Sequence, residues 1–295
     1  MRRVRRIPVG HLVSRAPAPA LFVVSGISMY VGAAMAVWLF DVASPSGVAW
    51  LRCLGAAIVL LAWRRPPRAA WRGRSLVLAG TFGTVTAGMN VVFYEAIARL
   101  PLGTAVAIEF AGPVTVAAVG SRRLRDVGAL LLVALGVVLI ADVQLEGSPL
   151  GVLFALAAAA AWAGYIVLGK RVALAPDGVS GQDSLAVGMA VATVVLSPLA
   201  VGTGPVWGSA ELLTIGVGVG VLSTVVPYAL DQVVLRRVGQ TSFALLLALL
   251  PVTATAIGFL VLAQIPAPVE AVGILAVVCG LLVRSRDDQA AGEPP

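Results

Sequence analysis

The sequence predicts an all-α integral membrane protein with ten transmembrane helices, arranged as two inverted five-helix repeats. Three observations lead to this prediction: the composition, the number of apolar runs and the placement of basic residues. Of the 295 residues, 59% are hydrophobic and only 12% are charged, whereas about 25% are charged in a soluble domain. The mean hydropathy is +0.99. A chain this apolar belongs in a lipid bilayer.

Ten apolar runs of about 20 residues, the length needed to cross the hydrocarbon core, follow one another along the chain. The first run follows a basic segment, residues 1–18, and is too long for the apolar part of a signal peptide, so an uncleaved first helix is expected. The expected helices cover 19–40, 45–63, 75–98, 101–120, 126–142, 149–169, 183–201, 211–235, 240–263 and 267–284.

Basic residues gather in every second connecting segment. All Lys and Arg except Arg52 and Arg99 fall before the first run, at or after the end of the last, or in the segments after the second, fourth, sixth and eighth runs. Because cytoplasmic loops retain Lys and Arg, this places both termini in the cytoplasm and the protein in the cytoplasmic membrane. The net charge of +7 therefore reports orientation, and nucleic acid is not expected as a partner.

An internal repeat divides the chain into 19–142 and 149–284, followed by a tail, 285–295, that is expected to be disordered and cytoplasmic. Arg99 lies fourteen residues before Pro113, and Arg237 lies fourteen residues before Pro251. Five helices per half give the halves opposite orientations, as in secondary transporters with a substrate site near the membrane midplane. Each proline removes a backbone donor, so Pro113 and Pro251 are expected flex points.

Several short motifs along nearly the whole chain resemble the EamA-type transporters of the drug/metabolite transporter superfamily, most closely the bacterial threonine/homoserine exporter group. The resemblance implies a ten-helix exporter that carries small metabolites out of the cytoplasm through a central cavity. The matching motifs are Leu51-Arg52, Gly88-Met89-Asn90, Phe93-Tyr94, Pro101-Leu102-Gly103, Glu109-Phe110, Gly112-Pro113, Ala161-Trp162-Ala163, Tyr165-Ile166, Leu222-Ser223-Thr224 and Pro227-Tyr228.

Charged and polar residues inside the apolar runs are costly and mark function. Arg52, Asn90 and Glu109 each lie seven or eight residues from the outer end of their helices, which is roughly 10 to 12 Å deep at a rise of about 1.5 Å per residue. Glu109 is expected to accept a substrate ammonium or a proton, Arg52 to bind a carboxylate, and Asn90 and Tyr94 to supply hydrogen bonds. The alternative is a structural ion pair between Arg52 and Glu109.

Aromatic residues and one further acid complete the candidate site. Trp162, Tyr165, Tyr30 and Tyr228 are candidates to line the cavity, although anchoring at the membrane interface is the usual role of a membrane Trp. Asp231 is either an inner gate or a local partner of nearby arginines.

An integral membrane enzyme acting on a lipid-linked substrate is the alternative function. Such an enzyme needs a catalytic cluster, but the chain has a single histidine, His11, and scattered acids. The two cysteines, Cys53 and Cys279, have no metal-ligand or disulfide spacing and are expected to be buried apolar residues. We therefore expect no enzymatic activity, no cofactor and no metal. The expected partners are a small-molecule substrate, the lipid bilayer and protons, and a homodimer is left open.

Overall fold

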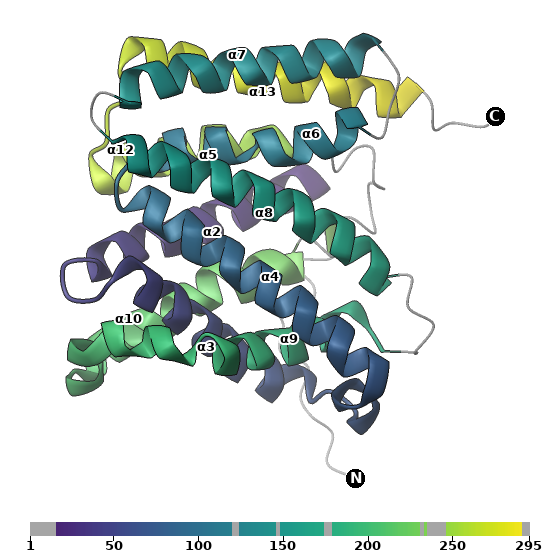
Figure 1. Ribbon diagram of the computed structural model, residues 1–295, viewed down its shortest axis with the longest axis vertical. Helices are drawn as coiled ribbons and strands as arrows, with labels where there is room; N and C mark the ends of the chain where they lie inside the picture. The colour runs from purple at the N-terminus through teal and green to yellow at the C-terminus, as the bar shows by residue number, and fades with distance from the viewer. Residues whose placement is uncertain are drawn as a thin grey trace.

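The computed structural model describes residues 16–119, 124–145, 148–173, 179–230, 233–234 and 246–290, and all regular elements within them are helical. The helices lie side by side across Figure 1, from α7 and α13 at one end of the long axis to α3, α9 and α10 at the other. Their bounds are α2 Ala18–Leu39, α3 Pro45–Arg64, η1 Arg68–Trp71, α4 Gly73–Ile97, α5 Leu102–Glu109, α6 Ala111–Val119, α7 Leu124–Leu145, α8 Pro149–Ala173, α9 Gly181–Val195, η2 Ser197–Gly208, α10 Ala210–Gly220, the π-helical η3 Val221–Val225, α12 Leu249–Leu262 and α13 Pro268–Ala290.

Five of the described helices are long and apolar enough to cross a membrane: α2, α3, α4, the first part of α8, and α10 together with η3 and the helical residues that follow it. The bent pair of α9 and η2 would make a sixth span, and four shorter apolar helices lie at Leu102–Val116, Val127–Ile140, Leu249–Leu262 and Pro268–Val283. The chain is therefore a multi-pass membrane protein, and the expected number of ten crossings stays a prediction.

Several of the ten expected helices are not continuous α-helices: the run at 240–263 has a turn at Ala248, and the run at 211–235 contains the π-helical η3. The run at 101–120 is divided into α5 and α6 by a turn at Phe110. Pro113 explains this break because it has no N–H to donate to the carbonyl of Glu109, one turn earlier. The run at 183–201 ends as an α-helix at Val195, and the chain then bends by 83° into η2. At the other end of the chain, α13 continues past the expected end at residue 284 to Ala290.

The helices approach one another closely where glycine faces a neighbouring backbone. A Cβ atom on Gly83 would overlap the backbone of Gly188, which brings α4 against α9, and a Cβ atom on Gly112 would overlap the carbonyl of Ala159, which brings α6 against α8. Small residues allow this because lipid offers no hydrophobic drive for association, so packing must supply it.

The packing pairs join the first and second halves of the chain throughout. α7 packs along α13, α4 packs on both α8 and α9, α3 packs on α9 and α10, and α12 packs on α2 and α5. The turns α2–α3, α4–α5 and α12–α13 lie together at one end of the bundle, on the left of Figure 1. Of the two cysteines, Cys53 is buried as expected, but Cys279 is exposed on α13.

Candidate functional site

Arg52 lies within α3 and is only 9% exposed. Its Nε donates to the hydroxyl of Thr224 at 3.0 Å, and its Nη2 donates to the carbonyl of Ser223 at 2.8 Å. Both partners belong to η3, where the π-helical hydrogen-bond pattern interrupts the α-helix. Such bulges are frequent at functional sites. The second half of the chain thus holds the guanidinium of the first half through neutral oxygens only.

Tyr94 lies beside Arg52, with the Cζ atom of the arginine 5.5 Å from the centre of the tyrosine ring. The tyrosine is completely buried. Among the described residues its hydroxyl has no partner at hydrogen-bonding distance and angle, although Arg52 and Ser223 act on it electrostatically. Asn90, one turn earlier on α4, is 4% exposed. The Tyr94 hydroxyl thus faces Arg52 and Ser223 without a well-aligned hydrogen bond.

Glu109 is the last residue of α5 and is 8% exposed, so its side chain is enclosed by protein and does not face lipid. The two ion pairs found among the described residues are Arg64–Asp183 and Arg99–Glu95. The expected alternative, an ion pair between Arg52 and Glu109, is therefore not formed in this structure, although Arg52 acts electrostatically on Glu109.

The aromatic candidates lie in two different places. Trp162 packs edge-on against Phe110, the residue next to Glu109, with ring centres 4.9 Å apart. Tyr165 stacks on Phe82 at 4.9 Å, further along α8. Both are half-buried. Tyr30 on α2 is buried, 3% exposed, in the same core cluster as Tyr94.

Tyr228 is not brought to the Arg52 cluster. Its hydroxyl donates to the carbonyl of Gly181 at 3.3 Å, at the beginning of α9. Arg64 and Asp183 form an ion pair of 3.3 Å at the same end of the bundle, and Ser180 caps α9 by accepting from the N–H of Asp183. Asp231 lies outside the described residues.

The sequence reasoning missed the contacts that hold Arg52. In the sequence, Ser223 and Thr224 stand out only as part of a motif. Only the fold brings them within reach of Arg52. A signal existed in principle, since two adjacent hydroxyl side chains inside an apolar run are candidates for polar contacts between helices.

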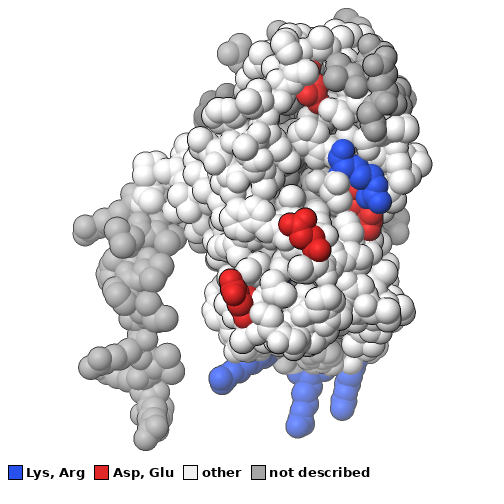
Figure 2. All heavy atoms as spheres, turned by 90° about the vertical axis from the view of Figure 1, so that its left-hand side faces the viewer, with Lys and Arg blue, Asp and Glu red and all other residues white. Residues whose placement is uncertain are grey.

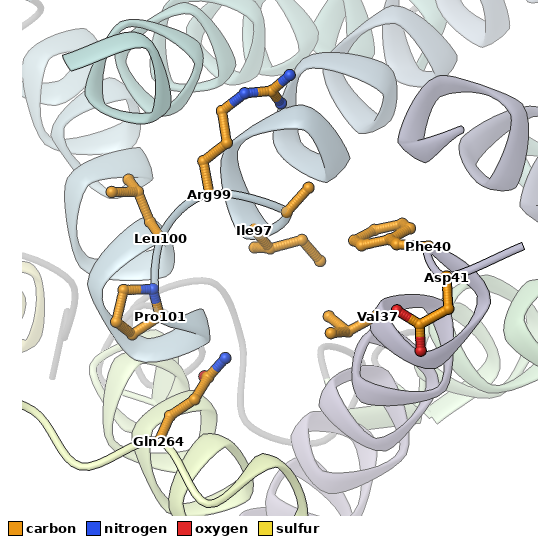
Figure 3. A pocket seen from close by; sticks show the side chains of 9 residues that line it. Val37, Phe40, Asp41, Ile97, Arg99, Leu100, Pro101 and Gln264 are labelled. Atoms are coloured by element: carbon orange, nitrogen blue, oxygen red, sulfur yellow. The ribbon is translucent and has the colours of Figure 1, made fainter. Parts of the chain in front are cut away.

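A pocket of about 390 Å³ opens at the end of the bundle that carries the α4–α5 turn. Figure 3 shows Phe40, Ile97 and Gln264 around the opening, and it shows the guanidinium of Arg99 turned away from it. Arg99 instead donates to both the carboxylate and the main-chain carbonyl of Glu95 on the preceding turn. The two residues are four apart on one helix face, the spacing at which such ion pairs form.

The described residues contain no group of three or more His, Cys, Asp or Glu side chains that could hold a metal ion. What the site contains is one buried cation, one buried carboxylate and neutral hydrogen-bonding groups inside a helical membrane bundle. Fold and site together define a polytopic membrane transporter.

Comparison with known proteins identifies the family. Residues 149–286 match the profile of the EamA-like transporter family. The chain is 31% identical over 255 residues, 85% of each chain, to the threonine/homoserine exporter RhtA of Salmonella typhimurium. It is 30% identical over 262 residues, 88% of each chain, to the exporter of the same name from Escherichia coli strain K12. The chain belongs to the EamA-like transporter family.

The fold is also found in a solved structure. A crystal structure whose title names it only as a protein superposes with a TM-score of 0.60 at 21% sequence identity. The superposition covers 93% of this chain and 99% of the other chain. At this identity the likeness concerns the fold alone.

Proposed function

We propose that this protein exports a small amino acid or amino-acid-like metabolite across the cytoplasmic membrane, with threonine and homoserine as the first candidates. The names of the RhtA relatives support the substrate class. The observation that carries the proposal is the polar centre, in which Arg52 and Glu109 are both buried without an ion pair between them.

A zwitterion fits this centre because it satisfies both charges at once. The substrate carboxylate replaces the neutral oxygens of Ser223 and Thr224 on Arg52, because a guanidinium and a carboxylate form two parallel hydrogen bonds between opposite charges. The substrate ammonium binds the carboxylate of Glu109. Asn90 and Tyr94 supply the neutral contacts, and Trp162 covers one side beside Phe110. Tyr30 completes the lining, and Tyr165 and Tyr228, which pack in a second cluster with Phe82, would face the path from the cytoplasm.

Alternating access of two inverted repeats is the proposed mechanism. The helix pairs support it, because α2, α3 and α4 of the first repeat correspond to α8, α9 and α10 of the second. The contact of α4 with α8 then corresponds to that of α10 with α2, and the contact of α4 with α9 to that of α10 with α3. All four contacts are present. The helix breaks support it as well, because turns at Phe110 and Ala248 each come three residues before Pro113 and Pro251. Five long helices, one bent pair and four shorter apolar helices are consistent with ten crossings.

The proposed orientation places both termini in the cytoplasm. Figure 2 views the end of the bundle that would face outward, and acidic side chains are scattered over it while basic ones project mainly beyond its lower edge. Asp41 after α2 and Glu211 at the start of α10 belong to this end. The arginine-rich turn at 64–74 lies at the opposite end, as expected for cytoplasmic loops.

The test is export measured in proteoliposomes loaded with labelled threonine or homoserine, with and without a pH gradient. We expect Glu109→Gln to lower the rate on the order of tenfold or more, because a charge-assisted contact contributes about 1.5–3 kcal/mol. Any dependence on the pH gradient should disappear in the same variant if Glu109 carries the coupling proton.

Glu211→Gln is the matched control, since it neutralises an acid of the same size at the start of α10, outside the polar centre. It should export at the rate of the unsubstituted protein. Normal export by Glu109→Gln at equal protein content would remove Glu109 from the mechanism. Absence of flux for every amino acid tested would contradict the substrate class.

A further inference from the structure

The pocket at the outer end of the bundle lies between the two halves of the chain. Residues from the end of α2, from the α4–α5 turn and from the segment after α12 line it. Its volume of about 390 Å³ is in the range of small-molecule sites. It is distinct from the Arg52 centre, which is buried below it.

The polar groups of this pocket suit a small zwitterion. Asp41 is exposed at the rim and has no ion pair among the described residues. The carbonyl ends of α2 and α4 also point to this region, and helix C-termini favour cations. Gln264 uses its Oε1 to accept from the N–H of Leu102 at 2.8 Å, so its amide N–H groups are left for a carboxylate. Figure 3 shows that amide directed into the opening.

Two aromatic rings in contact connect the lining of this pocket to Arg52. Phe40 lines the pocket and is half-buried. Its ring meets that of Tyr94 edge-on, with centres 6.0 Å apart, and Tyr94 in turn lies against Arg52. The sequence of contacts from the outside inward is therefore the pocket, Phe40, Tyr94 and Arg52.

We propose that the pocket is an exit site that binds the departing amino acid, with its ammonium at Asp41 and its carboxylate at Gln264, and that Phe40 against Tyr94 is the outer gate. The direction of movement rests on the proposed export function. The site and the gate are properties of the structure that can be tested without any transported substrate. Swinging Phe40 off the Tyr94 ring would join the pocket to the Arg52 centre.

The gate is tested by thiol labelling. In a Cys53→Ala, Cys279→Ala background, Asn90→Cys places a reporter one turn inside Tyr94. A membrane-impermeant thiol reagent added from outside should label it at least tenfold faster when Phe40→Ala is also present. Phe40→Trp, which keeps a large ring, should leave the labelling rate low. Leu100→Ala, which truncates an apolar residue of the same pocket, should do so too.

The exit site is tested by exchange of external threonine with proteoliposomes. Asp41→Asn should raise the external concentration for half-maximal exchange at least fivefold with little change in maximal rate, and Glu211→Gln should not. Equal labelling of the reporter with and without the Phe40 ring overturns the gate, whatever the substrate. Unchanged half-saturation in Asp41→Asn overturns the exit site. Absence of exchange in the unsubstituted protein, with gated labelling intact, overturns the amino-acid exit site and the proposed export but leaves the gate standing.

Discussion

Arg52 combines two directed hydrogen bonds and a ring contact, and each depends on the planar shape of its guanidinium. Lysine carries the same charge but cannot reproduce a two-pronged contact. We expect Arg52→Lys to lower export by roughly tenfold to a hundredfold, the equivalent of about 1.5–3 kcal/mol for one charged hydrogen bond. Thr224→Val removes only the hydroxyl partner and should have a smaller effect. Export by Arg52→Lys at the original rate would show that charge alone is sufficient.

Glu270 is a second buried acid, 3% exposed, but its oxygens are fully used. It accepts from Gln144 at 2.6 Å, from Thr104 at 3.1 Å and from the N–H of Ala267 at 2.8 Å. These bonds join α7, α5 and the start of α13. Its satisfied contacts assign it a structural role, in contrast to Glu109.

Glu270→Ala leaves three donors without this acceptor. The buried Thr104 hydroxyl costs about 1–3 kcal/mol when unsatisfied, and the part-buried donors of Gln144 and Ala267 cost less because water can reach them. We expect the free energy of unfolding in detergent to fall by about 2–4 kcal/mol. Thr253→Val, which removes an exposed hydroxyl bonded within its own helix, should change it by less than about 0.5 kcal/mol. Equal stability of both variants would contradict this account.

Depth along a helix predicts which polar residues of the apolar runs lie at one level of the membrane, but not which of them touch. Arg52 and Tyr94 do lie together, but Tyr94 is nearer the outer end of its helix than Arg52, so depth alone does not indicate this contact. That Arg52, Asn90 and Glu109 share one site at the same depth stays a prediction. Ser223 and Phe40 were not predictable as contacts, because both act across helices far apart in the sequence. Tyr228 was expected in the same cavity but bonds to Gly181 at the beginning of α9. An aromatic residue in an apolar run gives no sign of which neighbour it will contact.

At the scale of the helix, the break between α5 and α6 places Glu109 at a helix end. Pro113 lies in the first turn of α6, where proline is tolerated, so Pro113→Ala should change the free energy of unfolding by no more than about 1 kcal/mol. The alanine in Pro113→Ala supplies an N–H for the carbonyl of Glu109, so we expect this substitution to straighten the helix. A difference of about 1 kcal/mol between the straight and the broken helix changes the ratio of their populations about fivefold. Export should therefore fall by roughly that factor.

Pro205→Ala is the matched control for the helix break. Pro205 is exposed in η2, away from the polar centre, and its replacement should leave export unchanged. If Pro113→Ala exported at the original rate while remaining folded, the break at Phe110 would be a feature of packing and not of transport.

Most helix bounds followed from the apolar runs, because crossing a bilayer fixes both length and composition. α3 begins at Pro45 as expected, with Ser44 capping it through the N–H of Gly47. The bend after Val195 and the π-helical turn at Val221–Val225 were not predicted. The π-helical turn depends on tertiary contacts: η3 is bonded to Arg52 on one side and, through Ser28, to α2 on the other.

Over the whole molecule, α3 and α9 run side by side and are tied at both ends. At the outer end, the indole N–H of Trp50 donates to the carbonyl of Thr193 at 2.8 Å. At the inner end, Arg64 pairs with Asp183. These helices come from opposite halves of the chain, so rocking of the halves must loosen one of the two ties. In the orientation proposed above, the ion pair of Arg64 and Asp183 lies on the cytoplasmic side and would hold that side closed.

The ion pair of Arg64 and Asp183 is partly exposed, with side chains 29% and 13% accessible, so it contributes at most about 1 kcal/mol. Asp183→Asn should therefore shift the population toward the inward-open form by no more than about fivefold. The shift is measured as faster thiol labelling of Tyr165→Cys from the cytoplasmic side, in the Cys53→Ala, Cys279→Ala background. Arg64→Gln should have a similar effect, and the double variant should label no faster than either single one, because both substitutions remove the same contact. Additive effects would mean that the two residues act on labelling separately and that their ion pair does not close the cytoplasmic side.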